Sequence, residues 1–336
     1  MASAAPTLPK SKTGSSALTN PTPTTTSDTT TSASGHATSA HQQAEDAFLT
    51  ATNPDFKHPD HVIPRRNYSG FTDLIIVCCH AIYLPGASDA DFPLKSPHDE
   101  RNWLLAPFQK SNPETGKPGE QSTFVAHAQA GLDALSIHPD NVDLEKNLLV
   151  FSGGRTKKGT DMSEARSYYH ALLASELQQN HLGGGKTHAL FARGRILLEE
   201  HATDSLQNLL FSILLFRRTT GGYPRQIRVV THAFKARRVL ELHATAIRWP
   251  EDRVNVQGID PVMAVGELDE TLEGEEKSGY ALWDEDPLGA GEKLSGKRKQ
   301  RGWNEGIVDE LVEGLEEGVR DLVLGRVPEK VPWEST

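Results

Sequence analysis

The chain has 336 residues, enough for one large domain or two ordinary ones. Its 35 basic and 45 acidic residues give a formal net charge of −10, which argues against general nucleic-acid binding and against docking on anionic membranes. Hydrophobic residues make up 37% of the chain, a low share for a wholly folded protein, so we expect part of it to be disordered.

The two cysteines, Cys78 and Cys79, are adjacent within an apolar segment. Neighbouring side chains of a strand point to opposite faces, so this pair is typical of reduced, buried thiols in an intracellular protein. No segment has the ~20 apolar residues that a membrane-spanning helix needs. The first residues also lack the apolar core of a signal peptide. We therefore expect a cytoplasmic protein without a membrane span.

Residues 1–66 are rich in Ser, Thr, Ala and Pro. Such a segment cannot bury enough apolar surface to offset the entropy that ordering would cost. We expect it to be a disordered tail, with the folded part beginning near Phe71.

Strand and helix patterns alternate from residue 67 to residue 262. Short apolar runs predict buried strands at 74–79, 148–151, 196–198, 227–231 and 254–256. Apolar residues at helical spacing predict helices at 120–136, 163–179, 204–218 and 234–247, and the glycine-rich segment 181–190 is predicted to be a loop. This alternation is typical of an α/β domain with a mostly parallel sheet of about five strands.

The chain changes character after residue 262. An acidic run, Glu267–Glu276, is followed by a basic one, Lys293–Arg301, and opposed charge blocks usually face solvent. We expect residues 263–302 to be a solvated, flexible excursion from the core. Helical spacing returns in 303–336, which is predicted to be a closing helix that docks on the domain.

The carboxyl ends of parallel strands meet at one edge of the sheet, where ligands of open α/β folds bind. The polar residues that follow the predicted strands, or that begin the next helix, are therefore candidates for ligand binding. They are His80, Ser152, Gly153, Gly154, Arg155, Asp204, Ser205, Thr231, Lys235 and Arg238. His232 follows Thr231 directly, and its position is equally suitable for lining the site.

Two features of these candidates point to an anion. The amides of Gly153 and Gly154 could bind one at the start of the following helix; the alternative is a tight turn without a ligand. Lys235 and Arg238 lie in the first turn of their predicted helix, where cations oppose the helix dipole. That placement suggests an anionic partner, although simple surface charge would also explain it, and His80 could be a purely structural histidine.

Three residues are candidates for acid–base or positioning roles: Glu164, Glu200 and Asn208. Glu164 also fits a capping box, Asp204 fits a helix N-cap, and Glu200 or its neighbour Glu199 could be a surface carboxylate. Asn208 belongs to a polar stripe beside an apolar one, so it needs partners if it is buried. The sequence carries no metal-binding signature and no Gly-x-Ser-x-Gly elbow of an α/β-hydrolase.

Several of these segments together resemble the DUF218 family of SanA/YdcF-like proteins, and in particular a fungal branch of that family. The resemblance spans residues 71 to 260. Its motifs are Ser152-Gly-Gly with Ser163-Glu-Ala165, Glu199 through Asn208, and Val230-Thr231 through Arg238. Three positions depart from the bacterial pattern: Lys235 stands where those members have His, Ala202 where they have Ser, and Cys79 where they have Gly.

The resemblance implies a Rossmann-like, three-layer α/β/α domain with its site at these motifs. It names no settled reaction and no cofactor. We therefore expect a small anionic or nucleotide-like ligand, held by the candidate binding residues and acted on by a hydrolase or transferase. The alternative is a non-catalytic, ligand-sensing or scaffold module that recruits protein partners.

Overall fold

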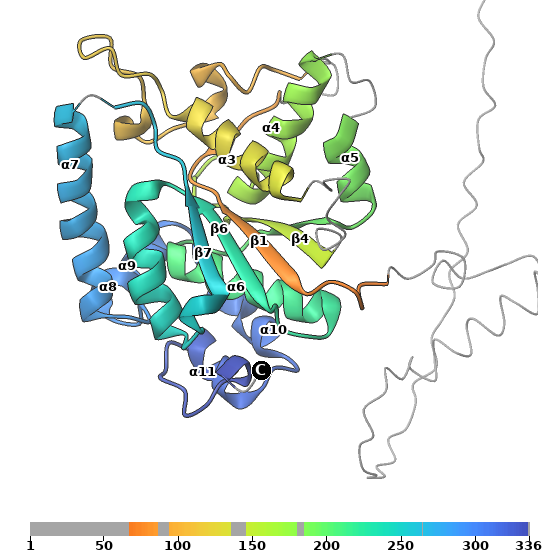
Figure 1. Cartoon of the computed structure of the whole chain (residues 1–336). Coiled ribbons are helices and arrows are strands. Elements are labelled where there is room, and N and C mark those ends of the chain that lie inside the picture. Colours follow the sequence, from red (N-terminus) through yellow and green to blue (C-terminus); the bar gives the residue numbers. More distant parts are fainter. Residues whose placement is uncertain (1–66, 87–93, 136–145, 180–184, 264, 335–336) are drawn as a thin grey trace, which may run out of the picture. The chain divides into compact units, whose positions relative to one another are not determined.

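The computed structural model describes residues 67–86, 94–135, 146–179, 185–263 and 265–334. The tail predicted for residues 1–66 lies outside these residues. The described part is an α/β domain in which a five-stranded parallel sheet has helices on both faces, a Rossmann-like three-layer arrangement (Figure 1). The fold class expected from the sequence is therefore confirmed.

The sheet contains all five predicted strands, in the order β5-β4-β1-β6-β7. Their bounds are β1 Asp73–Cys78, β4 Asn147–Ser152, β5 Ile196–Glu199, β6 Gln226–Thr231 and β7 Val254–Gly258. Every neighbouring pair is parallel. The chain adds strands outward on one side of β1 and then crosses to the other side, so the order reverses between β1 and β6. That reversal creates the crevice where open α/β sheets bind ligands.

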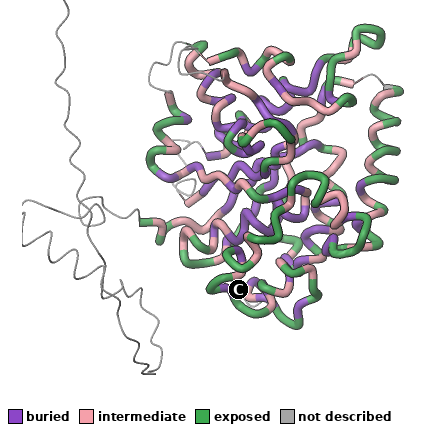
Figure 2. The backbone as a smooth tube through the Cα atoms, turned by 180° about the vertical axis from the view of Figure 1, so that it is seen from behind, coloured by how far each residue is buried: buried purple, intermediate pink, exposed green. Residues whose placement is uncertain are grey.

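Helices cover each face of the sheet with a separate apolar layer. Helix α3 (Gln121–Ala134) and helix α4 (Glu164–Gln178) pack on one face, and helix α6 (Ser205–Thr220) packs on the other (Figure 1). The middle strand is buried on both faces, as its continuous apolar run predicts. Buried positions are concentrated along the strands and the helix faces against them (Figure 2).

Local signals explain where helix α6 begins and ends. Asp204 is its N-cap, and its side chain accepts a hydrogen bond from the backbone N–H of Gln207 at 2.9 Å. Gly221 ends the helix in the left-handed conformation, with φ of 84°, which glycine adopts without strain.

Some local predictions need correction. The predicted loop 181–190 includes the start of helix α5 (Gly185–Ala192), while residues 180–184 lie outside the described part. The helix predicted at 234–247 begins as a 3-10 turn, Ala233–Lys235, and continues as the π-helix Arg238–Ala244. A two-stranded antiparallel ribbon, β2 (Ile82–Tyr83) with β3 (Trp103–Leu104), was not predicted. Further 3-10 turns span Glu100–Asn102, Pro107–Gln109, Glu251–Arg253, Glu305–Ile307 and Pro332–Glu334.

The charged segment 263–302 is not a solvated excursion. It forms helix α7 (Val265–Glu275), a π-helical turn (Glu276–Tyr280), helix α8 (Ala281–Glu285) and helix α9 (Glu292–Gln300). Trp283 and Leu294 from this segment are buried in the same core cluster as helix α6. Many charges of these helices are exposed, but Glu275 and Arg298 form nearly buried ion pairs with the rest of the domain. The few buried apolar side chains are too far apart to produce a visible sequence period.

The last segment packs on the domain, but as two short helices rather than one. Helices α10 (Val308–Val312) and α11 (Glu317–Val323) bury Leu311 and Leu322 against the core. Trp333 is fully buried and donates a hydrogen bond from Nε1 to the carbonyl oxygen of Ile247 at 2.9 Å. None of the helices in the described ranges is long and apolar enough to cross a membrane.

Candidate functional site

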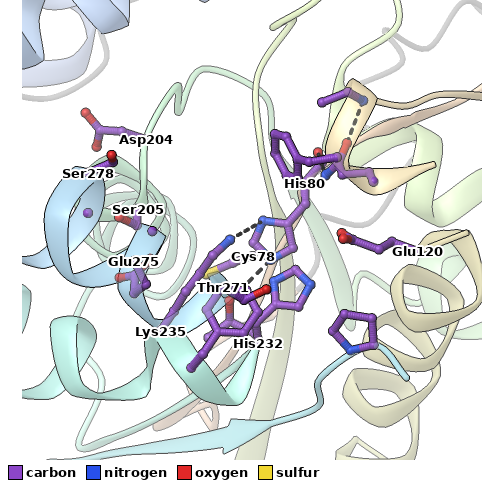
Figure 3. Close-up of a pocket in the computed structure, with 18 of the residues that line it drawn as sticks. Cys78, His80, Glu120, Asp204, Ser205, His232, Lys235, Thr271, Glu275 and Ser278 are labelled. Carbon is purple, nitrogen blue, oxygen red and sulfur yellow. Dashed lines mark hydrogen bonds between the residues drawn. The ribbon is translucent and has the colours of Figure 1, made fainter. Parts of the chain in front are cut away.

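A cavity of about 1030 Å³ opens at the carboxyl edge of the sheet, above the reversal between β1 and β6. The ends of these two strands, the segment 106–112 and the residues that follow β6 line it. Helix α7 contributes Thr271 and Glu275 to the lining (Figure 3), and helix α9 contributes Leu294 and Lys297. The segment expected to be a solvated excursion therefore encloses the site.

Lys235 lies at the centre of this cavity. Its Nζ is 3.5 Å from Nδ1 of His80, and Nε2 of His80 is 3.2 Å from Oγ1 of Thr231 (Figure 3). Among the described residues, no carboxylate lies within ion-pair distance of Lys235. Burial, followed by the positive charge of Arg238, lowers the pKa of Lys235 to about 8. The side chain is thus mostly a cation at neutral pH, and within the described ranges no carboxylate forms an ion pair with it.

Three stacked aromatic rings lie beside Lys235. His80 stacks on His232 with ring centroids 4.5 Å apart, and His232 stacks on Phe234 at 4.8 Å. Burial first, and then the charge of Lys235, lower the pKa of both histidines well below the usual value, so they are neutral at pH 7. Within the described part of the chain, neither ring nitrogen of His232 has a hydrogen-bond partner, although the residue lines the cavity. Buried polar atoms normally have hydrogen-bond partners, so these two ring nitrogens need a ligand or water as a partner.

Arg238 is the second cation of the site and is only 8% exposed. Its Nη1 lies 2.9 Å from Oε1 of Glu275 on helix α7. A Cβ atom at Gly279 would overlap this guanidinium, so the glycine allows the turn after helix α7 to approach it. The predicted excursion therefore supplies the carboxylate that pairs with a predicted binding residue.

Three other predicted residues line the same cavity. Burial raises the pKa of the Glu164 carboxyl to about 7, although Thr156 donates a hydrogen bond to it. Asp204 caps helix α6 and also pairs with Nε of Arg298 at 2.5 Å. Oγ of Ser205 is 2.7 Å from Nε2 of His243. Glu164 is the cavity carboxyl best suited to exchange a proton near neutral pH.

A buried cluster lies directly beneath the cavity. Ser152 donates a hydrogen bond to Glu199 at 2.6 Å, and its Oγ is 3.1 Å from Oδ1 of Asn208. Glu199 also accepts hydrogen bonds from two backbone N–H groups that follow it, at 2.7 and 3.0 Å. Only Asn208 of this cluster lines the cavity. The cluster ties β4, β5 and helix α6 together and holds Asn208 in place.

The Gly-Gly turn does not form the anion cradle that the sequence suggested. The N–H of Gly153 donates to the carbonyl oxygen of Glu199 at 3.0 Å, and that of Gly154 donates to Ala202 at 2.7 Å. A Cβ atom at Gly154 would lie 2.9 Å from the same Ala202 oxygen. The glycines therefore form a tight turn without a ligand, in which the backbone at Gly154 lies close to the backbone at Ala202. Neither they nor the exposed Arg155 line the cavity.

Glu200 also lies away from the cavity lining. Its carboxylate pairs with Arg166 at 2.6 Å and accepts a hydrogen bond from Ser163 at 2.6 Å. These partners lower its pKa against the effect of burial. Eight predicted residues therefore line the cavity together: His80, Glu164, Asp204, Ser205, Asn208, Thr231, Lys235 and Arg238. Five others lie outside the lining, namely Ser152, Gly153, Gly154, Arg155 and Glu200, although Ser152 contacts Asn208.

Several cavity residues were missed at the sequence level. Glu120 follows the polar loop at 94–119, and the others come from the charged segment after residue 262. They include Glu267, Thr271, Glu275, Lys297 and Arg301. The only sequence signal for the latter group was the paired acidic and basic runs. In the described part of the chain, no group of three or more His, Cys, Asp or Glu residues is arranged to hold a metal ion.

The chain is similar to an uncharacterised protein of Saccharomyces cerevisiae, YOR238W. The two are 26% identical over 308 residues, covering 78% of this chain and 97% of the yeast protein. No protein-family model matches the chain, and no solved structure matches it. The resemblance to the DUF218 family therefore stays a prediction, and the site must be interpreted from its own geometry.

Proposed function

We propose that this protein binds a small anionic or nucleotide-like ligand in the cavity at the carboxyl edge of its sheet. The observation that carries the proposal is the position of Lys235, a cation inside a cavity with no carboxylate partner among the described residues. Arg238, Lys297 and Arg301 add positive charge to the same lining. Concave sites with a few convergent charged groups at this position of an α/β sheet are typical ligand sites.

We further propose that the protein acts on this ligand as a hydrolase or transferase. Glu164 supports this step because it lines the cavity and its pKa is about 7, so it can accept or donate a proton near neutral pH. Asn208 would position the reacting group. We do not extend the acid–base role to Glu200, because its carboxylate is held by Arg166 outside the lining.

We also propose that the protein belongs to the DUF218 family and that it is located in the cytoplasm. The DUF218-like motifs support membership of a SanA/YdcF-like branch, because Lys235, Arg238, Asn208 and Glu164 from three of them line one cavity. The free, buried thiols of Cys78 and Cys79 support a reducing, cytoplasmic location.

Binding is tested by titrating the full chain with inorganic phosphate and pyrophosphate in a calorimeter. Lys235→Met should weaken binding about 10- to 150-fold, the effect of losing a charged hydrogen bond of roughly 1.5–3 kcal/mol. Lys277→Met is the matched control, because Lys277 is exposed, pairs with Glu273 and does not line the cavity. Equal binding by wild type and Lys235→Met would refute the assigned site.

Catalysis is tested by screening the full chain for turnover of nucleotides and phosphate esters. Glu164→Gln should abolish turnover while keeping phosphate affinity. The control Asp161→Asn, at an exposed carboxylate three residues earlier in the chain, should keep both. Binding without turnover of any compound would instead assign the non-catalytic, ligand-sensing role.

A further inference from the structure

We propose that Lys235 is a nucleophilic amine, and that the anionic ligand of this cavity carries an aldehyde or ketone group with which Lys235 forms an imine. The inference rests on the proposed anion site and specifies the class of ligand that the site takes. It concerns covalent chemistry that anion binding alone would not require.

The first support is the lack of any neutralising partner. Two other lysines that line the cavity are engaged elsewhere: Nζ of Lys117 donates to a backbone oxygen at 2.7 Å and lies 3.6 Å from Glu120, and Nζ of Lys297 donates to Ser278 at 3.1 Å. The polar contact of Lys235 in the described structure is Nδ1 of a neutral His80. An amine in this setting can lose a proton without breaking an ion pair.

The second support is the positive charge around the amine. The guanidinium of Arg238 and the desolvated setting both favour the neutral amine, which is the nucleophilic form. A like charge beside a buried lysine is the arrangement that activates amine nucleophiles. The same cations would hold the carboxylate or phosphate of the incoming ligand, so its carbonyl carbon would be brought to the amine.

The third support is a proton donor in the same lining. Imine formation begins when the ammonium loses a proton and the nitrogen lone pair attacks the carbonyl carbon. The resulting hydroxyl group then takes up a proton and leaves as water, while the C–O bond breaks and the C=N bond forms. Protonated amine and carbonyl give protonated imine and one water, so charge and atoms balance. Glu164 lines the same cavity, and its pKa of about 7 lets it protonate the leaving hydroxyl.

The test uses pyridoxal 5′-phosphate as the probe, because it combines an aldehyde with a phosphate. The full chain is incubated with a limiting amount at pH 7.5, the imine is reduced with borohydride, and the modified lysine is located by mass spectrometry of peptides. We expect labelling at Lys235 to exceed labelling at the exposed Lys277 at least ~10-fold, because burial and the charge of Arg238 lower the pKa of Lys235 to about 8. Glyoxylate with cyanoborohydride should label the same residue.

Phosphate binding and lysine labelling, measured separately on the wild-type protein, separate this inference from the proposed binding function. Lys235→Arg removes the amine that forms the imine, so the total label fixed by borohydride should fall to the level of the exposed lysines. Inorganic phosphate should also protect Lys235 of the wild-type protein from labelling. If phosphate binds the wild type but Lys235 is labelled no faster than Lys277, the inference is overturned while the anion site stands. If Lys235 is labelled selectively and phosphate neither binds nor protects, the nucleophile stands and the anion site fails.

Discussion

At the scale of single residues, Lys235 shows how position changes the chemistry of a common side chain. The same ammonium on a surface would be paired or hydrated, whereas here it faces a cavity beside Arg238 and a neutral His80. Its sequence signal was only a cation near the start of a helix, which predicted an anionic partner. The site's other predicted cation, Arg238, is partly neutralised by Glu275, a pairing that local sequence could not predict because the two residues belong to different segments.

The pKa of Lys235 makes anion binding sensitive to alkaline pH. Phosphate affinity should fall roughly 10-fold between pH 7 and pH 9, because an ammonium with a pKa of about 8 is mostly neutral at pH 9. Calorimetric titration at both values measures this change. Lys235→Arg stays charged throughout, so its affinity should not fall, and it also corrects for the ionisation of phosphate itself. A parallel loss of affinity in that variant would contradict the assignment.

At the scale of elements, helix α9 makes a nearly buried ion pair with the start of helix α6. Arg298 of this helix pairs with Asp204, the N-cap of helix α6, and both side chains are nearly buried, at 12% and 10% exposure. Asp204 therefore fixes the start of one helix and the position of another. Because α9 forms a wall of the cavity, the contact also links the core to the site.

Breaking this contact should cost stability. Arg298→Met should lower the free energy of unfolding by about 3 kcal/mol, because it leaves Asp204 with an unpaired charge in a nearly buried position. Urea denaturation followed by circular dichroism measures the difference. The neighbouring Lys299→Met removes an exposed pair with Glu305 and should change stability by less than ~0.5 kcal/mol. Equal changes in the free energy of unfolding for the two variants would show that the Arg298–Asp204 pair stabilises the fold no more than an exposed pair does.

The elements that sequence patterns predicted well are those with dense apolar periods. The strands β1, β4, β5, β6 and β7 and the helices α3, α4 and α6 each carry such a period, so the sheet, its edge and the residues along that edge could be predicted. Helix α9 buries one apolar side chain, Leu294, and the leucines of helix α7 are exposed, so these two helices could not be predicted from an apolar period. The Gly153-Gly154 turn was ambiguous for a different reason: a cradle and a close backbone approach require the same two glycines.

At the scale of the whole molecule, the protein buries several ionisable groups near its cavity. Four buried histidines, His80, His127, His232 and His243, have pKa values lowered chiefly by burial, and the carboxyls of Glu164 and Glu199 have pKa values of about 7. The histidines destabilise the fold in acid and the carboxyls destabilise it in base. The two contributions oppose one another where they overlap: the histidines reduce stability as pH falls below 6.5, and the carboxyls reduce it as pH rises from 4.5 through 7.

Glu199 allows one of these contributions to be isolated. Its pKa is about 7 in the folded protein and 4.5 without that environment, so its contribution to stability is fully present below pH 4.5 and is lost as pH rises through 7. Glu199→Gln has no such titration. Relative to wild type, this variant should therefore gain on the order of 3 kcal/mol between pH 5 and pH 8, as measured by chemical denaturation at both values. The histidines cancel in this comparison. A difference that does not change with pH would contradict the raised pKa, and the exposed Glu305→Gln serves as the control.

The placement of β1 has a consequence for how the protein is made. This strand is the first to leave the ribosome, yet it lies at the middle of the sheet, with Asn147 opposite Asp73 on one side and Gln226 on the other. At about 5–20 residues per second, synthesis of the ~150 residues between Asp73 and Gln226 takes on the order of 10–30 s. One edge of an apolar strand stays unpaired during that interval, the condition in which nascent chains aggregate or recruit chaperones. The yield of this protein in cells therefore depends on how that edge is protected during translation as well as on the stability of the finished fold.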